Sequence, residues 1–401
     1  MNINPEANGF HTNKKEAEPA WAGVVSLSLG VFGLVTAEFL PASLLTPISQ
    51  DLHVSIGAAG QSVTMTAVIG AIAGPAIVIG TSRFDRRLTL LGLTALLVVS
   101  SLLAAFSDGL ATLLVARGLL GIALGGFWAM SLALAMRLVP EQLMPRAMAI
   151  IMTGVSVATV CAAPVGAWVG EAYGWRSAFV IAAAVGGLAF IAQLLTLPAM
   201  PSTGAAGLGT MATVLRRPAI RLGLLTVLLV VAGHFAGFTF IRPFLETVPH
   251  FGVEGISVVL LAFGIGGFLG NLFGGFVSER STALSIVIAA VGIAATTLAL
   301  ALAGSLPSVA FAATALWGFA FGALPVSVQS FVTQAASDEA ESAGALMLTT
   351  FQVAISSGAA IGGLIVEAQG LAGVFGFAAI AALCGSLVIG ILSRRTVAVA
   401  S

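Results

Sequence analysis

The chain has 401 residues, of which 58% are hydrophobic and only 8% are charged. So few polar residues cannot cover the surface of a soluble protein, and this composition therefore excludes a water-soluble globular domain and indicates a surface solvated by lipid. Lysine and arginine together number 16, as do aspartate and glutamate, so the chain lacks the basic excess typical of nucleic-acid-binding proteins.

Apolar segments long enough to cross a membrane follow one another along the chain. A membrane-spanning helix needs roughly 20 mostly apolar residues. The sequence predicts such helices at 22–47, 57–82, 87–106, 110–138, 145–170, 177–198, 220–247, 255–278, 282–304, 307–334, 342–367 and 371–392. It therefore predicts an all-α integral membrane protein with twelve transmembrane helices.

Basic residues are distributed unevenly between the two faces of this arrangement. With a cytoplasmic N-terminus, every lysine and arginine except Arg117, Arg176 and Arg242 falls in a cytoplasmic segment. Because cytoplasmic loops carry an excess of basic residues, both termini are expected in the cytoplasm.

A stretch rich in Gly, Ser, Thr and Pro separates the sixth and seventh predicted helices, and such a composition predicts a linker. The expected organisation is a cytoplasmic tail at 1–20, a six-helix bundle at 21–198, a cytoplasmic linker at 199–218, a second six-helix bundle at 219–393 and a tail at 394–401.

The two halves repeat a pattern. The segment "VGAWVGEAYGW" (Val165–Trp175) resembles "IGGLIVEAQGL" (Ile361–Leu371), with Glu171 and Glu367 at equivalent places. An even number of spans separates the copies, so the repeats are parallel and predict a solute site between the halves near the middle of the membrane.

Small residues recur at every fourth position of the fifth predicted helix, and Pro164 interrupts that helix. Such stripes allow close helix contact, either as ordinary packing or as a surface on which helices slide. The residues expected to pack or hinge are Pro41, Gly154, Pro164, Gly166, Gly170, Gly358 and Gly362.

Three motifs carry a family resemblance that extends over nearly the whole chain. The segments "RGLLGIALGGFWA" (Arg117–Ala129), "GVSVATVCAAPVGAWVG" (Gly154–Gly170) and "EAYGWRSAF" (Glu171–Phe179) resemble the drug/proton antiporter branch of the major facilitator superfamily. Other stretches, including "EFLPASLLTPISQDL" (Glu38–Leu52) and "FTFIRP" (Phe238–Pro243), resemble nucleoside-exporting members of the superfamily.

The resemblance implies the major facilitator fold and a proton-coupled efflux antiporter that works by alternating access in the bacterial inner membrane. It implies a small-molecule substrate, most simply a purine ribonucleoside, with sugar or multidrug efflux as the alternative. The expected partners are that substrate, protons and the lipid bilayer, with no nucleic acid, no cofactor, no metal and a monomeric chain.

Charged loops after the second and eighth predicted helices, "GTSRFDRRLTLL" and "GGFVSER", resemble the cytoplasmic gate of the family, although the first lacks the usual glycine. The alternative is that these loops only anchor the protein through their positive charge. The gate candidates are Asp85, Arg86, Arg87, Glu279 and Arg280.

Two opposite charges, Glu38 and Arg117, lie deep within predicted spans. Such groups are costly unless they are paired or face water, so they are functional candidates. At ~1.5 Å per residue the two lie at similar depth, which predicts a pair that carries the coupling proton. The alternatives are a purely structural ion pair, or a Glu38 at the membrane interface.

Several polar or aromatic residues within spans are candidates for the substrate site. Arg242 is expected either to hold a polar substrate group or to reach outward to the interface. Intramembrane amides can bind a nucleoside, but they also join helices. The candidates are Gln61, Trp128, His234, Phe238, Arg242, Asn271, Gln329 and Gln352.

Other functional classes are not supported by the sequence. It contains neither an HExxH motif nor a phosphate-binding GxxxxGK[ST] loop, so we expect neither an intramembrane enzyme nor an ATP-driven pump. The loops between spans are short, which disfavours a receptor.

Overall fold

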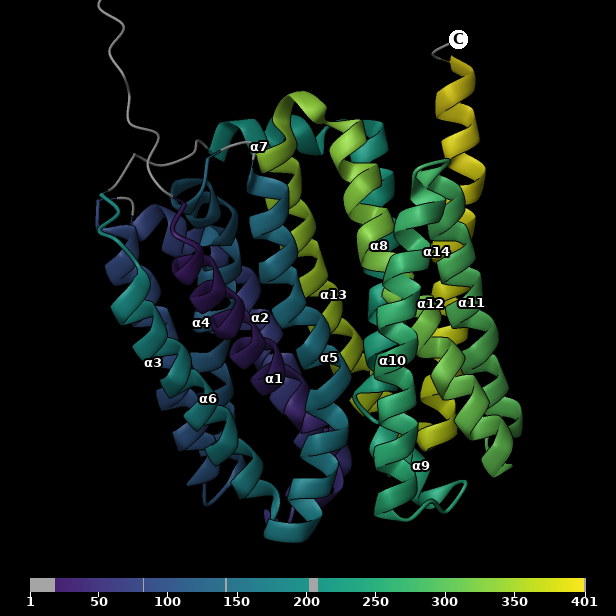
Figure 1. Ribbon diagram of the computed structural model, residues 1–401. Coiled ribbons are helices and arrows are strands. Elements are labelled where there is room, and N and C mark those ends of the chain that lie inside the picture. Colours follow the sequence, from purple (N-terminus) through teal and green to yellow (C-terminus); the bar gives the residue numbers. More distant parts are fainter. Residues whose placement is uncertain (1–18, 82, 141–142, 202–207, 400–401) are drawn as a thin grey trace, which may run out of the picture.

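The computed structural model describes residues 19–81, 83–140, 143–201 and 208–399, almost all of them helical (Figure 1). Apolar segments in lipid must satisfy their backbone groups internally, so they form helices. The helices are α1 (Trp21–Asp51), α2 (Ile56–Gly80), α3 (Arg86–Ala105), α4 (Leu110–Leu138), α5 (Met144–Tyr173), α6 (Trp175–Thr196), α7 (Leu208–Leu215), α8 (Pro218–Phe238), α9 (Ile241–Thr247), α10 (Val253–Ser278), α11 (Thr282–Ala303), α12 (Pro307–Ala335), the short 3-10 helix η2 (Ser337–Glu339), α13 (Ala340–Gln369) and α14 (Leu371–Val399).

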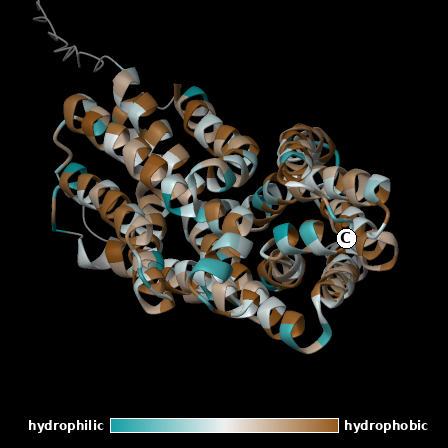
Figure 2. Ribbon diagram, turned by 90° about the horizontal axis from the view of Figure 1, so that it is seen from below, coloured by the Kyte–Doolittle hydropathy of each residue, from teal (hydrophilic) through white to brown (hydrophobic). Residues whose placement is uncertain are grey.

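Twelve of these helices are long and apolar enough to cross a membrane, which confirms the predicted number. They form two groups, α1–α6 and α8–α14, which stand side by side in Figures 1 and 2. The beginning of α1, the short helix α7 and the end of α14 lie at one end of the molecule, here called the terminal end, and α9 lies at the opposite end (Figure 1). The helices α3, α6, α11 and α14 pack mainly within their own halves and carry exposed apolar side chains such as Leu188 and Ile380.

The sequence repeat corresponds to a repeated helix crossing. A Cβ atom added at Gly125 of α4 would collide with the backbone of Gly70 on α2, and one at Gly322 of α12 would collide with Gly267 on α10. Close backbone approach at both crossings therefore requires glycine. Asp85 caps the N-terminus of α3 with its side chain, and Ser281 does the same for α11.

The small-residue stripes pack inside each half and not between the halves. A Cβ atom at Gly154 of α5 would collide with the carbonyl oxygen of Ser28 on α1, and one at Gly358 of α13 would collide with that of Ala232 on α8. The stripes therefore join α5 to α1 and α13 to α8.

Gly154→Val is expected to lower the stability of the protein strongly. Overpacking a tight contact costs typically about 1–3 kcal/mol, and here the obstacle is backbone. The measurement is the unfolding temperature of the detergent-solubilised protein. Gly92→Val on α3 is the control, because nothing lies within 4 Å of the added Cβ atom there. Equal unfolding temperatures for the two variants would contradict the packing role of Gly154.

The seventh span differs from the prediction, since it breaks instead of running unbroken over 220–247. The helix α8 ends at Phe238 and α9 begins at Ile241. Pro243 lacks a backbone N–H and leaves the carbonyl of Thr239 without its helical donor, which accounts for the break. Helices interrupted in this way often line the solute site of a transporter.

Candidate functional site

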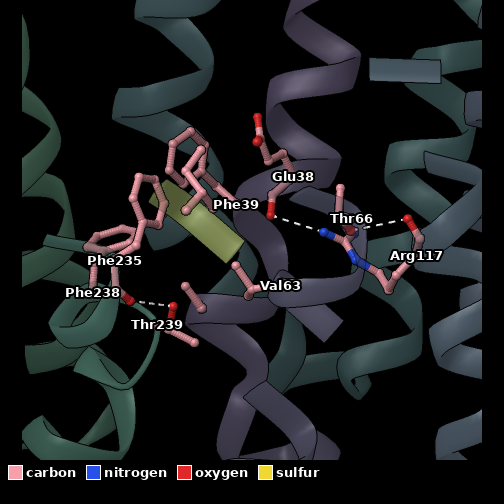
Figure 3. A pocket seen from close by; sticks show the side chains of 10 residues that line it. Glu38, Phe39, Val63, Thr66, Arg117, Phe235, Phe238 and Thr239 are labelled. Atoms are coloured by element: carbon pink, nitrogen blue, oxygen red, sulfur yellow. Dashed lines mark hydrogen bonds between the residues drawn. The ribbon is translucent and has the colours of Figure 1, made fainter. Parts of the chain in front are cut away.

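A small pocket lies between the two halves, at the level where α8 ends (Figure 3). One wall comes from the first half and carries the polar side chains of Glu38 and Arg117. The lining residues are Glu38, Phe39, Ala42, Val63, Thr66, Arg117, Phe235, Phe238, Thr239 and Ile355. The pocket thus brings together three predicted site residues, Glu38, Arg117 and Phe238.

The two prolines of α1 provide acceptors for two buried arginines. A proline removes the N–H that would bind the carbonyl four residues earlier, so Pro41 frees the carbonyl of Ala37 and Pro47 frees that of Ser43. Arg117 Nη1 donates to the carbonyl of Ala37 at 2.7 Å, and Arg242 Nη1 donates to the carbonyl of Ser43 at 2.6 Å. The prolines therefore anchor α4 and α9 to α1.

Arg117 is 1% exposed, and backbone oxygens satisfy its guanidinium. In addition to the carbonyl of Ala37, it donates to those of Ser62 at 3.1 Å and Glu38 at 3.2 Å. A buried cation is tolerated when its hydrogen bonds are made in this way.

Glu38 and Arg117 lie side by side, but the guanidinium contacts the main chain of Glu38 and not its carboxylate. The guanidinium binds the main-chain oxygen of Glu38, and neither an ion pair nor a hydrogen bond joins it to the carboxylate in this structure. Figure 3 shows the carboxylate pointing away from Arg117. In this conformation Arg117 is a charged neighbour of Glu38 and not a hydrogen-bonded partner of its carboxylate, because Pro41 leaves the main-chain oxygen of Ala37 free for the guanidinium. The carboxylate is left half-buried beside the pocket.

The facing wall of the pocket is aromatic. Phe235 and Phe238 of α8 reach across to Phe39 of α1, with ring centroids 6.4 and 5.8 Å away respectively (Figure 3). The sequence analysis missed Phe39, Thr66, Phe235 and Thr239. Two of these residues could have been found from the sequence: Phe39 is adjacent to Glu38, and Phe235 lies one helical turn before Phe238.

His234 lies behind this aromatic wall, fully buried. Its ring stacks on Phe321 with a centroid distance of 3.4 Å, and neither ring nitrogen has a hydrogen-bond partner among the described residues. A buried polar atom without a partner costs about 1–3 kcal/mol, so a histidine that merely fills space does not explain this arrangement.

Arg242 lies outside the pocket, at the end opposite the termini. It is 3% exposed, so it does not reach outward to the interface. Besides the carbonyl of Ser43, it binds Glu246 at 2.7 Å and approaches Glu171 at 3.9 Å. Arg242 therefore links α9 to both α1 and α5.

The other substrate-site candidates do not line the pocket. Gln352 is buried where α13 crosses α2, close to Gly70, and Gln61 lies at the same interface near Gly363. Gln329 and Asn271 are exposed, and Trp128 is half-buried on α4.

The side chains of the gate candidates contact residues of their own half or of the segment that follows it. Asp85 accepts hydrogen bonds from the backbone N–H groups of Arg87 and Met200, and Arg86 approaches Thr81 at 3.4 Å. Arg280 lies over the ring of Phe276, and Glu279 is exposed. These residues therefore do not join the halves in this conformation.

At the same end of the molecule, hydrogen bonds from Arg217 lower the pKa of Asp338 to about 2.

Within the described parts of the chain, no group of three or more His, Cys, Asp and Glu side chains is placed to hold a metal ion. Cys161 and Cys384 are free thiols.

The amino-acid sequence is similar to those of known membrane transporters. A family profile described as Major Facilitator Superfamily matches residues 27–359. The purine ribonucleoside efflux pump NepI of Escherichia coli O157:H7 is 41% identical over 353 residues, which cover 88% of this chain and 89% of that protein. The protein of the same name from Escherichia coli K12 is 40% identical over the same length.

A solved structure shares the fold. It is a bacterial homolog of the human lysosomal transporter Spinster, in an inward-facing and occupied conformation. The TM-score is 0.72 at 16% identity, and the match covers 92% of this chain and 96% of that one. Together with the twelve membrane-crossing helices, these similarities show that the chain belongs to the major facilitator superfamily of membrane transporters.

Proposed function

We propose that this transporter exports purine ribonucleosides across the bacterial inner membrane in exchange for protons, by alternating access. Its relatives at about 40% identity are named as purine ribonucleoside efflux pumps. The distribution of basic residues supports a cytoplasmic location for both termini, so the terminal end of the molecule faces the cytoplasm. The chain works as a monomer, with one solute pathway between its two halves.

The observation that carries this proposal is the amphipathic pocket between the halves. Its aromatic rings, those of Phe39, Phe235 and Phe238, give the pocket a flat apolar surface of the kind that accommodates a nucleoside (Figure 3). The polar side chains of Glu38 and Thr66, in the first half, offer oxygen atoms to the ribose hydroxyls.

The position of Glu38 supports proton coupling. Because backbone carbonyls satisfy Arg117, the carboxylate of Glu38 can gain or lose a proton without leaving the guanidinium unpaired. A permanent ion pair would instead hold the carboxylate in its charged form. Glu38 is therefore the proton carrier, and Arg117 acts as its positive neighbour.

The contacts between the halves support alternating access. Among the described residues, the polar contacts that join the halves gather at the end opposite the termini, on Arg242, Glu246 and Glu367. Nearer the middle of the membrane, α10 meets α5 where a Cβ atom at Gly264 would lie 3.0 Å from the carbonyl oxygen of Val160. Pro164 removes the helical donor of that carbonyl, so the proline of α5 lies at the junction of the two halves.

Everted inner-membrane vesicles with an acidic interior test the proposal. They are expected to accumulate inosine or adenosine, up to about tenfold per pH unit for one-to-one exchange, and to lose protons as the solute enters. Vesicles from cells without the transporter are the control. Accumulation that persists after nigericin has collapsed the pH gradient would refute proton coupling. Transport of sugars or cationic drugs without nucleosides would refute the substrate.

A further inference from the structure

A group of aromatic rings from three helices surrounds His234 next to the pocket. The imidazole is nearly parallel to Phe321, at 2°, and to Phe238, at 14°, with centroid distances of 3.4 and 5.4 Å. Phe263 stacks at 6.2 Å, and Trp317 meets the imidazole edge-on at 5.1 Å. The rings come from α8, α10 and α12 of the second half.

This group contains polar atoms that no described residue satisfies. They are both nitrogens of His234 and Nε1 of Trp317, and both side chains are fully buried. A neutral imidazole has one donor and one acceptor, and an indole has one donor. Buried polar atoms are normally hydrogen-bonded, so these three atoms on two adjacent side chains are available to bind a ligand.

Phe238 separates these atoms from the pocket. It lines the pocket, and it also stacks on His234. It is the last residue of α8, immediately before the break at Thr239 and Phe240. A side chain at a helix break can change its rotamer without disturbing a continuous helix. Phe238 can therefore move and open a path from the pocket to His234.

We propose that His234, Trp317 and Phe321 form the subsite that binds the base of the transported solute, reached when Phe238 turns aside. The inference rests on the proposed export of nucleosides and assigns the recognition of the base to specific residues. The ligand class is a flat, uncharged heterocycle with both donors and acceptors, such as a purine. The base stacks on Phe321 and bonds with His234 and Trp317, while the sugar stays in the pocket beside Glu38 and Thr66.

His234→Phe tests the hydrogen bonds of the subsite, because it keeps an aromatic ring and removes both nitrogens. The concentration of inosine that half-saturates the purified protein is expected to rise roughly ten- to hundredfold, as the loss of one or two hydrogen bonds implies. The unfolding temperature of the ligand-free variant is expected to stay the same or rise, because unpaired polar atoms are removed. Unchanged inosine affinity would overturn the proposal. A clearly lowered unfolding temperature of the ligand-free variant would also overturn it, because the imidazole nitrogens would then stabilise the empty protein.

Tryptophan fluorescence gives a second readout. Hypoxanthine, a free purine base, is expected to quench the wild-type protein, and Trp317→Phe is expected to lose most of that quenching. Trp168→Phe is the matched control, because Trp168 is 54% exposed on α5, and it is expected to retain the quenching. Equal quenching in the two variants would overturn the subsite.

The failure of this inference is distinguishable from that of the proposed function. Wild-type vesicles that accumulate inosine, combined with a His234→Phe variant of normal inosine affinity, would leave nucleoside export standing and refute the subsite. Hypoxanthine quenching that depends on Trp317, in a protein that moves no nucleoside in any gradient, would support the subsite and refute nucleoside export.

Discussion

The Glu38→Gln variant is expected to lose proton-driven export almost completely. Glu38 is the one carboxylate among the residues that line the pocket, and glutamine keeps its size while it cannot release a proton. Solute accumulation in everted vesicles with an acidic interior should fall from about tenfold per pH unit to no accumulation. The variant should still fold, because Arg117 binds the main chain of residues 37, 38 and 62 and not the carboxylate.

Exchange of labelled for unlabelled solute without a pH gradient separates coupling from binding. Glu38→Gln is expected to retain this exchange, since the pathway and the aromatic wall are intact. Glu254→Gln is the control, because Glu254 is an exposed carboxylate in the first turn of α10, outside the pocket. Proton release on solute entry that persists in Glu38→Gln would show that another group carries the proton.

The helices and their repeat could be predicted because each rests on local information. Apolar length gives the spans, and glycines at a fixed offset mark the equivalent crossings, where Gly125 and Gly322 have the same role. The effect of a proline on the carbonyl four residues earlier is also local, so a freed acceptor near Glu38 was predictable from Pro41.

The partners of the buried charges could not be predicted in the same way. Arg117 and Arg242 each bind a carbonyl that lies far away in the sequence, so the choice depends on how the helices pack. The positions of Glu38 and Arg117 along their helices predict that they lie at the same depth, but they do not determine which oxygen atoms accept hydrogen bonds from the guanidinium. The stacking of His234 on Phe321 likewise depends on side-chain directions in α8 and α12, which hydrophobic periodicity does not determine.

The Arg242→Leu variant is expected to open the end of the molecule that lies opposite the termini. Arg242 joins α9 to α1 through the carbonyl of Ser43, which Pro47 frees, and it orients Glu246, which accepts a hydrogen bond from Thr46 on α1. Hydrogen bonds of charged groups contribute roughly 1.5–3 kcal/mol each. Their loss should therefore shift the balance toward the form open at this end by about tenfold or more.

A thiol placed in the pocket measures this opening. Ala42 lines the pocket and is 4% exposed, so Ala42→Cys in a background without Cys161 and Cys384 reports access. Intact cells are treated with a membrane-impermeant thiol reagent, and Arg242→Leu is expected to increase the labelling rate by about tenfold or more. Arg242→Lys, which keeps the charge but loses the forked geometry, should fall between the wild type and the leucine variant.

Arg176→Leu is the matched control for this opening. Arg176 forms an ion pair with Asp51 at the same end of the molecule, but both residues belong to the first half and are partly exposed. Breaking that pair should leave the labelling of Ala42→Cys unchanged, because it holds no contact between the halves. An equal increase in both arginine variants would mean that general loosening of this end, and not the bond of Arg242 to α1, controls access to the pocket.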